Sequence, residues 1–175
     1  MKIFVPGRLC LFGEHSDWAG EYRYFNSKLA KGFTLIVGTN QGIYAKVNPH
    51  PDQLLLQVHC GERNSRQFYR LPMNANVLLK EARRGGFFSY IAGVAYQCMT
   101  SYAVGGLDIN NYLTTLPIKK GLSSSAAISV LVARAFNQIY NLNLTVRAEM
   151  ELAYLGERTT PSRCGRMDQA LSLIH

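Results

Sequence analysis

The sequence predicts one α+β domain that spans residues 1–175. Segments with strand-like composition come early in the chain, and segments with three- and four-residue apolar spacing come later. No internal repeat, linker or low-complexity tract divides the chain. Apolar residues make up 47% of the sequence and charged residues only 17%. This composition supports a packed core and excludes a disordered protein.

Four short strands are expected in the first third of the chain. Their β-branched and aromatic content places them at residues 2–5, 34–37, 43–47 and 54–58. A Pro6-Gly7 break follows the first strand, and residues 39–42 have the composition of a turn between the second and third strands.

Three helices are expected in the second half. Residues 87–102 carry apolar side chains at helical spacing, and Leu107 and Ile109 then begin a further strand. Residues 123–140 are apolar nearly all round, which predicts a buried helix. Thr145 can cap a third helix that runs to about Glu157.

The charge balance is basic, with a formal net charge of +8. A basic surface favours anionic partners such as nucleotides, phosphorylated metabolites or nucleic acid. The basic residues are scattered rather than striped, with Arg83-Arg84 and Lys119-Lys120 as the only adjacent pairs, which argues against nucleic acid. No apolar run approaches the ~20 residues of a membrane span, and no signal sequence is recognisable. We therefore expect a cytoplasmic protein that does not enter a membrane.

The most specific local pattern is PIKKGLSSSAA at residues 117–127, where a glycine and three serines open a long helix. The first N–H groups of a helix lack internal partners and the helix dipole is positive there, so this end can bind an anion. Serine hydroxyls add donors or can ligate Mg²⁺. The alternative is that the serines only cap the helix.

A second polar cluster follows the first strand, in the segment PGRLCLFGEHSDWAG at residues 6–20. Arg8, Glu14, His15 and Asp17 are expected on a loop there. Carboxylates accept hydrogen bonds from sugar hydroxyls, and Trp18 could stack on a sugar face. The alternative is a solvated polar turn.

Two further carboxylates lie near the end of the sequence. Glu157 ends an apolar stripe formed by Met150, Ala153 and Tyr154, and a buried carboxylate needs a partner such as Mg²⁺ unless it faces water. Asp168 lies in the segment CGRMDQ, where it could equally be an ordinary turn or capping residue.

Together, these three segments resemble the motifs of the GHMP kinase family, and they are nearest to those of the galactokinase group. The first family motif is similar to PGRVNLIGEHTDYNG, the second to GGGLSSSAA and the third to CGxMDQ. The likeness extends along the whole chain and corresponds to the N-terminal half of the family.

The resemblance implies a fold similar to ribosomal protein S5 domain 2, and it implies an ATP-dependent sugar kinase. Asp168 would be the catalytic base and Arg8 its electrostatic partner. Glu14, His15 and Asp17 would bind the sugar, which is galactose or a related aldose. ATP phosphates would be wrapped by the residues of the second motif, namely Gly121, Leu122, Ser123, Ser124, Ser125 and Ala126. Ser125 and Glu157 would hold Mg²⁺.

The sequence departs from the family pattern at three points. Lys119 and Lys120 stand where the family usually has glycines, and Glu157 is one residue nearer to Asp168 than in galactokinases. The chain also stops seven residues after Asp168, so we expect the C-terminal domain of the family to be absent. Self-association or pairing with a separate C-terminal half would follow. The alternative to a kinase is a non-catalytic sugar- or nucleotide-binding module, or one half of a split enzyme.

Overall fold

The computed structural model describes residues 1–60, 65–116, 124–162 and 164–173. Its elements are, in order, β1 (Lys2–Phe12), α1 (Glu14–Ala19), the 3₁₀ helix η1 (Gly20–Tyr24), β2 (Leu35–His50), β3 (Gln53–Cys60), β4 (Ser65–Pro72), α2 (Ala75–Arg84), α3 (Phe87–Ser101), β5 (Gly106–Thr114), α4 (Ser124–Ile139), α5 (Val146–Arg158) and the 3₁₀ helix η2 (Asp168–Leu173).

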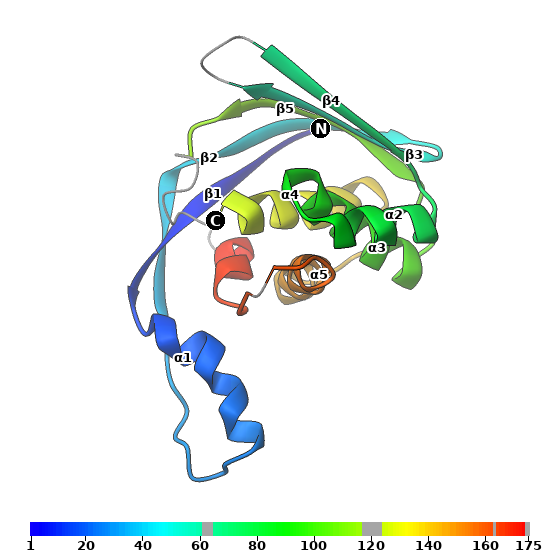
Figure 1. Ribbon diagram of the computed structural model, residues 1–175. Coiled ribbons are helices and arrows are strands. Elements are labelled where there is room, and N and C mark those ends of the chain that lie inside the picture. The colour runs from blue at the N-terminus through cyan, green and yellow to red at the C-terminus, as the bar shows by residue number, and fades with distance from the viewer. Residues whose placement is uncertain (61–64, 117–123, 163, 174–175) are drawn as a thin grey trace.

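One curved sheet with helices on a single face forms the body of the protein (Figure 1). The strand order is β1-β2-β5-β3-β4, in which β3 and β5 run parallel and the other neighbours are antiparallel. Helix α4 packs against β1 and β2, and α3 and α5 cover it from the other side. This arrangement confirms the predicted α+β class.

The central helix α4 explains why the core is so continuous. All side chains from Ala126 to Phe136 are buried, because the helix has the sheet on one side and other helices on the other. The prediction of a helix that is apolar nearly all round and buried is therefore confirmed. None of the described helices has the length and apolar character that crossing a lipid bilayer requires.

The first strand is longer than predicted, because the Pro6-Gly7 pair does not end it. Strand β1 continues to Phe12, with a register shift against β2 between Pro6 and Arg8. It lies at the edge of the sheet, where a residue without an N–H group is tolerated. As a consequence, Arg8 lies within a strand rather than on a loop, and Glu14, His15 and Asp17 lie on helix α1.

The predicted turn at residues 39–42 is also wrong, since β2 is one strand from Leu35 to His50. In the pairing with β1, Gly38 lies opposite Arg8 and Gly42 opposite Pro6. Three residues of β2 therefore lie opposite one residue of β1, which is a β-bulge. The polar, turn-like sequence marks this bulge rather than a reversal of the chain.

Strand β4 and helix α2 were not predicted, whereas the cap of α5 was. The Thr145 hydroxyl accepts a hydrogen bond from the Ala148 N–H at 3.3 Å, as expected of an N-cap. Helix α2 begins in the same way, because the Asn74 side chain accepts hydrogen bonds from the N–H groups of Asn76 and Val77.

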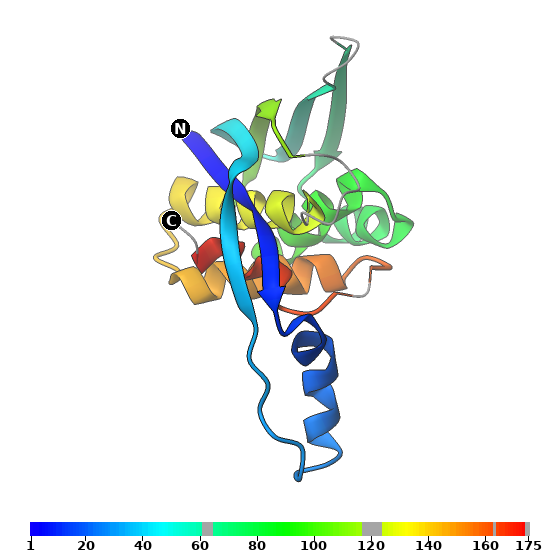
Figure 2. The ribbon, with the colours of Figure 1, turned by 90° about the vertical axis from the view of Figure 1, so that its left-hand side faces the viewer.

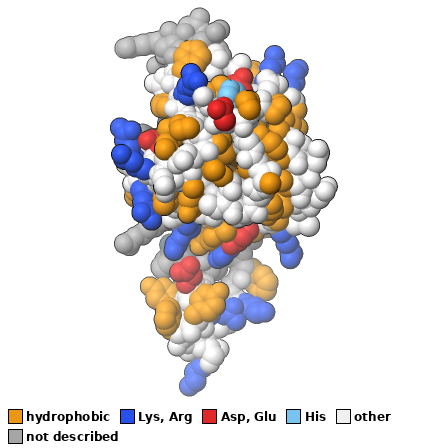
Figure 3. Space-filling view, turned by 90° about the vertical axis from the view of Figure 1, so that its right-hand side faces the viewer, with side chains coloured by type: hydrophobic (Ala, Val, Ile, Leu, Met, Phe, Trp, Pro, Cys, Tyr) orange, Lys and Arg blue, Asp and Glu red, His pale blue; other side chains and the backbone are white. Residues whose placement is uncertain are grey.

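An arm formed by α1, η1 and the connection to β2 projects away from the body (Figure 2). Several of its aromatic side chains are exposed to solvent, among them Tyr24, Phe25 and Phe33 at 86–89%. Figure 3 shows hydrophobic side chains gathered on this projecting part of the molecule. The arm therefore contributes little to the hydrophobic core.

Helices α3 and α5 cross in backbone contact, because glycines face each other at the crossing. A Cβ atom on Gly93 would overlap the Gly156 carbonyl, and one on Gly156 would overlap Val94. The two glycines thus let α5 approach the body closely, and α5 carries Glu157.

We expect Gly156→Ala to lower the free energy of unfolding by about 2 kcal/mol. A Cβ on Gly156 would lie only 2.7 Å from two backbone atoms of Val94, so the overpacking cost lies near the upper end of about 1–3 kcal/mol, and the gain in helix propensity of up to about 1 kcal/mol offsets only part of it. Urea unfolding measures the difference. The matched control is Gly20→Ala, because nothing lies within 4 Å of a Cβ there and φ is −57°. If both variants lose the same free energy of unfolding, the close contact between α3 and α5 is not the cause of the loss in Gly156→Ala.

Candidate active site

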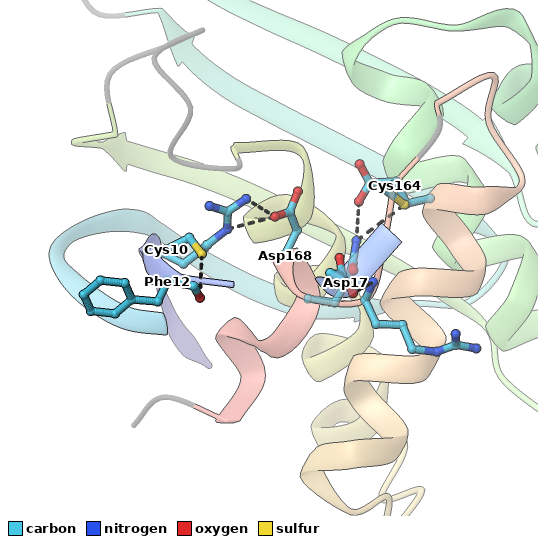
Figure 4. A network of polar contacts seen from close by, with 9 residues as sticks. Cys10, Phe12, Asp17, Cys164 and Asp168 are labelled. Carbon is cyan, nitrogen blue, oxygen red and sulfur yellow. Dashed lines mark hydrogen bonds and ion pairs between the residues drawn. The ribbon is translucent and has the colours of Figure 1, made fainter. Parts of the chain in front are cut away.

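An ion pair between the first strand and the last 3₁₀ helix forms the centre of the candidate site. The Arg8 Nε donates to Asp168 Oδ1 at 2.8 Å, and Arg8 Nη2 contacts the same oxygen (Figure 4). The Arg8 side chain is only 11% exposed and that of Asp168 is 26% exposed. Within the described residues no hydrogen bond reaches Asp168 Oδ2, so this oxygen can accept one from another molecule.

A second carboxylate, Glu157, lies buried at the end of α5 with 2% exposure. Gln169 Nε2 donates to Glu157 Oε2 at 2.6 Å, and the Ser125 side chain also hydrogen-bonds to Glu157. Burial raises the pKa of Glu157, the two hydrogen bonds lower it, and the negative charge of Asp168 raises it further. The net shift is upward, because burial is the largest of these effects.

The thiol of Cys164 lies beside this carboxylate. Burial, reinforced by the charge of Glu157, raises the pKa of Cys164 to about 12. The thiol is therefore protonated at neutral pH and is not a nucleophile, since thiolate is the reactive form.

Ser124, Ser125 and Ala126 occupy the first turn of α4, with Ser124 as its first residue. Gly121, Leu122 and Ser123 lie outside the described residues. No acidic side chain lies in this first turn, so nothing in it offsets the positive end of the helix dipole. The hydrogen bond from Ser125 to Glu157 brings this helix end to the second carboxylate.

The oxygen atoms of Ser125 and Glu157 suit a hard cation. Mg²⁺ in phosphoryl-transfer sites typically takes one or two carboxylates and completes its shell with phosphate and water. The described residues hold no cluster of three or more His, Cys, Asp or Glu side chains that would make a self-sufficient metal site. The donor set therefore fits Mg²⁺ that is bound together with a nucleotide.

The arm is joined to the loop before Asp168 through Asp17. Asp17 Oδ1 accepts a hydrogen bond from the Arg166 backbone N–H at 2.9 Å, and a Cβ atom on Gly165 would overlap the Asp17 carboxylate. A larger residue at position 165 would therefore displace the Asp17 carboxylate from its present position. By contrast, Glu14 and His15 are exposed on α1, and His15 lines a different hollow of about 360 Å³.

A cavity of about 710 Å³ lies between the arm and the α5 side of the body. Asp17 and Tyr24 line it from the arm, Tyr154 and Arg158 from α5, and Arg166 from the following loop. Its volume lies in the range of about 300–1,000 Å³ that small-molecule sites take. The structure brings Asp17 to this cavity but does not bring Glu14 or His15 to it.

Two residues of the site were quoted in the sequence motif without a role. Gln169 bonds to Glu157, and Arg166 makes two 3.0 Å hydrogen bonds to Glu151 while its guanidinium lies 4.2 Å from the centre of the Tyr154 ring. Position next to Asp168 was the only sequence signal for Gln169. Arg166 lies in a loop and its partners lie on α5, and no spacing in the sequence indicates these contacts.

The chain is similar in sequence to known kinases. Residues 89–175 match the family described as "GHMP kinases N terminal domain". A galactokinase of Pyrococcus furiosus is 31% identical over 172 residues, which cover 96% of this chain and 43% of that protein. A galactokinase of Chloroflexus aurantiacus is 28% identical over 173 residues, covering 97% and 40% respectively. The chain therefore spans about two fifths of the length of these relatives.

Solved structures share the fold. Methanococcus jannaschii mevalonate kinase aligns with a TM-score of 0.75 at 21% identity, over 99% of this chain and 51% of that one. Lactococcus lactis galactokinase, solved in complex with galactose, aligns with a TM-score of 0.69 at 20% identity, over 97% and 40%.

Proposed function

Because this chain carries the N-terminal domain of the GHMP kinases, as its motifs predicted, we propose that it is part of an ATP-dependent sugar kinase. One observation carries the proposal: the Arg8–Asp168 ion pair lies in the same site as the Ser125–Glu157 contact at the start of α4. Phosphoryl transfer needs a group that orients the acceptor hydroxyl and a positive environment for the phosphates. The name of the curated relatives favours a sugar, galactose or a related aldose, as the acceptor.

In this proposal Asp168 orients the acceptor hydroxyl and takes its proton. The hydroxyl donates to Oδ2, while Arg8 holds Oδ1 and keeps the carboxylate oriented. The guanidinium fixes the direction of the carboxylate, and a carboxylate positioned in this way can accept the proton of the acceptor hydroxyl.

The start of α4 would bind the phosphates of ATP. The predicted phosphate-binding segment comprises Gly121, Leu122, Ser123, Ser124, Ser125 and Ala126, and the last three of these form the first turn of α4. The free N–H groups at the start of a helix point at a bound anion. Ser125 and Glu157 would hold Mg²⁺, which neutralises charge on the transferring phosphoryl group when bound. The bound cation would compensate the negative charge of Glu157, which burial disfavours.

A substrate panel with ATP and Mg²⁺ tests the proposal on the natural protein that contains this chain. Galactose, arabinose, other aldoses and non-sugar polyols are compared by coupled ADP release, with calorimetry of each compound in parallel. ATP-dependent phosphorylation of one aldose supports the proposal. Tight sugar or nucleotide binding without any turnover would instead indicate a non-catalytic binding module.

Asp17 is the described residue we expect to determine sugar affinity, because it lines the cavity and is fixed by the Arg166 N–H. Asp17→Asn keeps an oxygen that can accept from that N–H group, but it removes the charged carboxylate oxygen that would accept hydrogen bonds from sugar hydroxyls. The dissociation constant of the best sugar should rise roughly 10- to 150-fold, equivalent to the ~1.5–3 kcal/mol of a hydrogen bond to a charged group.

Calorimetric titration measures this change. Glu21→Gln is the control, since it removes another carboxylate from the same cavity outside the motif, and its effect should stay below about threefold. Equal affinities of wild type and Asp17→Asn would leave Asp17 with only the structural role of holding the loop.

A further inference from the structure

The side chain of Gln169 joins the two halves of the proposed catalytic machinery. It is fully buried, and its Nε2 donates to Glu157 Oε2 at 2.6 Å. Its neighbour in the chain, Asp168, bonds to Arg8 on β1. Two successive residues at the start of η2 therefore hold one group from the first strand and one from α5.

The contact with Gln169 restricts how the Glu157 carboxylate can turn. Glu157 lies at the end of α5 with 2% exposure, so solvent does not compete for its oxygens. Gln169 occupies Oε2, and Ser125 approaches the same carboxylate from the start of α4. Hydrogen bonds in such a buried setting have defined geometry, because breaking one leaves a polar group unsatisfied.

We propose that Gln169 is a positioning residue that orients the Glu157 carboxylate for Mg²⁺ and couples its position to that of Asp168. This inference rests on the proposed function, in which Ser125 and Glu157 hold the ion. Groups that hydrogen-bond to a ligating carboxylate fix its direction, and their loss typically lowers metal affinity about 10- to 100-fold.

The residue type fits this role. A carboxamide donates to Glu157 without carrying charge, so it holds the carboxylate and leaves its negative charge for the cation. A lysine or arginine would neutralise that charge and compete with Mg²⁺, and a glutamate would repel it. The carboxamide also lies 3.9 Å from the Cys164 sulfur, so the same side chain packs the segment before Asp168.

The test is Gln169→Met, which keeps the length of the side chain and removes the donor. Its control is Gln97→Met, because Gln97 Nε2 donates to Thr159 Oγ1 at 3.0 Å, two residues beyond Glu157 and outside the site. Mn²⁺ binding is followed by electron paramagnetic resonance in the presence of a non-hydrolysable ATP analogue. We expect Mn²⁺ affinity to fall at least about tenfold in Gln169→Met and to stay within about twofold of wild type in Gln97→Met.

Further measurements separate positioning from loss of structure. Thermal unfolding checks that each variant folds, and Gln169→Asn, which withdraws the amide by one methylene, replaces Gln169→Met if that variant does not fold. Raising the Mg²⁺ concentration should restore turnover in a folded variant, and the KM for the sugar should not change. If the folded Gln169 variants bind Mn²⁺ with wild-type affinity, the inference about Gln169 is wrong, but the proposed function still stands. Failure of the wild-type protein to bind Mn²⁺ with the nucleotide would overturn the proposed function as well.

Discussion

Asp168→Asn is expected to lower the turnover number about 10²–10⁴-fold while the protein stays folded and still binds its sugar. Positioned acid–base groups contribute about this factor. The substitution keeps the volume of the side chain and an oxygen that can accept from Arg8, so the packing of η2 against β1 should survive. The carboxamide cannot take up the proton of the acceptor hydroxyl.

Steady-state kinetics with saturating ATP and sugar measure the effect, and calorimetry measures sugar binding in the same variant. Asp52→Asn is the control, since that side chain is 75% exposed and lies far from the site in the chain. The assignment of Asp168 as the base fails if the variant retains more than about a tenth of wild-type turnover. Loss of sugar binding together with turnover would point to a substrate-binding role instead.

Glu149→Gln is expected to lower the free energy of unfolding by about 3 kcal/mol, since breaking a buried ion pair by removing one partner typically costs ~3–5 kcal/mol. Arg134 Nε on α4 donates to Glu149 Oε2 at 3.2 Å, and both side chains are at most 7% exposed. Asn137 Nδ2 donates to Glu149 Oε1 at 2.8 Å. Glutamine would remove the charge that the buried guanidinium faces and would place an NH₂ group against that of Asn137.

The control for this prediction lies on the same helix, two residues away. Glu151 pairs with Arg166, but these side chains are 40% and 50% exposed, so solvent screens the pair. Glu151→Gln should therefore lower the free energy of unfolding by less than about 1 kcal/mol. Urea unfolding of the three proteins decides the matter, and similar midpoints for both variants would show that the pair on α4 and α5 contributes little.

Helices α3, α4 and α5 were predicted from the sequence because their signals are local, whereas α1 was expected to be a loop and α2 was not predicted. Helix α5 has an apolar stripe and a threonine cap, and α4 is apolar on all sides because it is buried on all sides. Helix α2 carries the same kind of cap at Asn74 and could have been found by it. Strand β4 could not have been found from such a local signal, because it is an edge strand that pairs with β3 and exposes 70% of Phe68.

The strands and the site depended more on tertiary structure. Polar residues at 39–41 signal a turn locally, but pairing with β1 turns them into a bulge within β2. The resemblance implied that Arg8 is the electrostatic partner of Asp168, and the structure shows an ion pair between them, while their catalytic roles are a proposal. The bond from the Arg166 N–H to Asp17 depends on how the arm lies against the loop, which no periodicity encodes.

The separation of Arg8 and Asp168 along the chain has a consequence for how the protein folds. The two partners are 160 residues apart, so their contact closes a loop that contains nearly every other element. Such a closure is entropically unfavourable until the intervening strands and helices have packed and shortened the distance. On the ribosome, Arg8 emerges long before Asp168, so a nascent chain holds an edge strand with an unneutralised guanidinium until the last described helix docks. We therefore expect the ion pair to be among the last contacts to form, after the strands and helices between its two partners have packed.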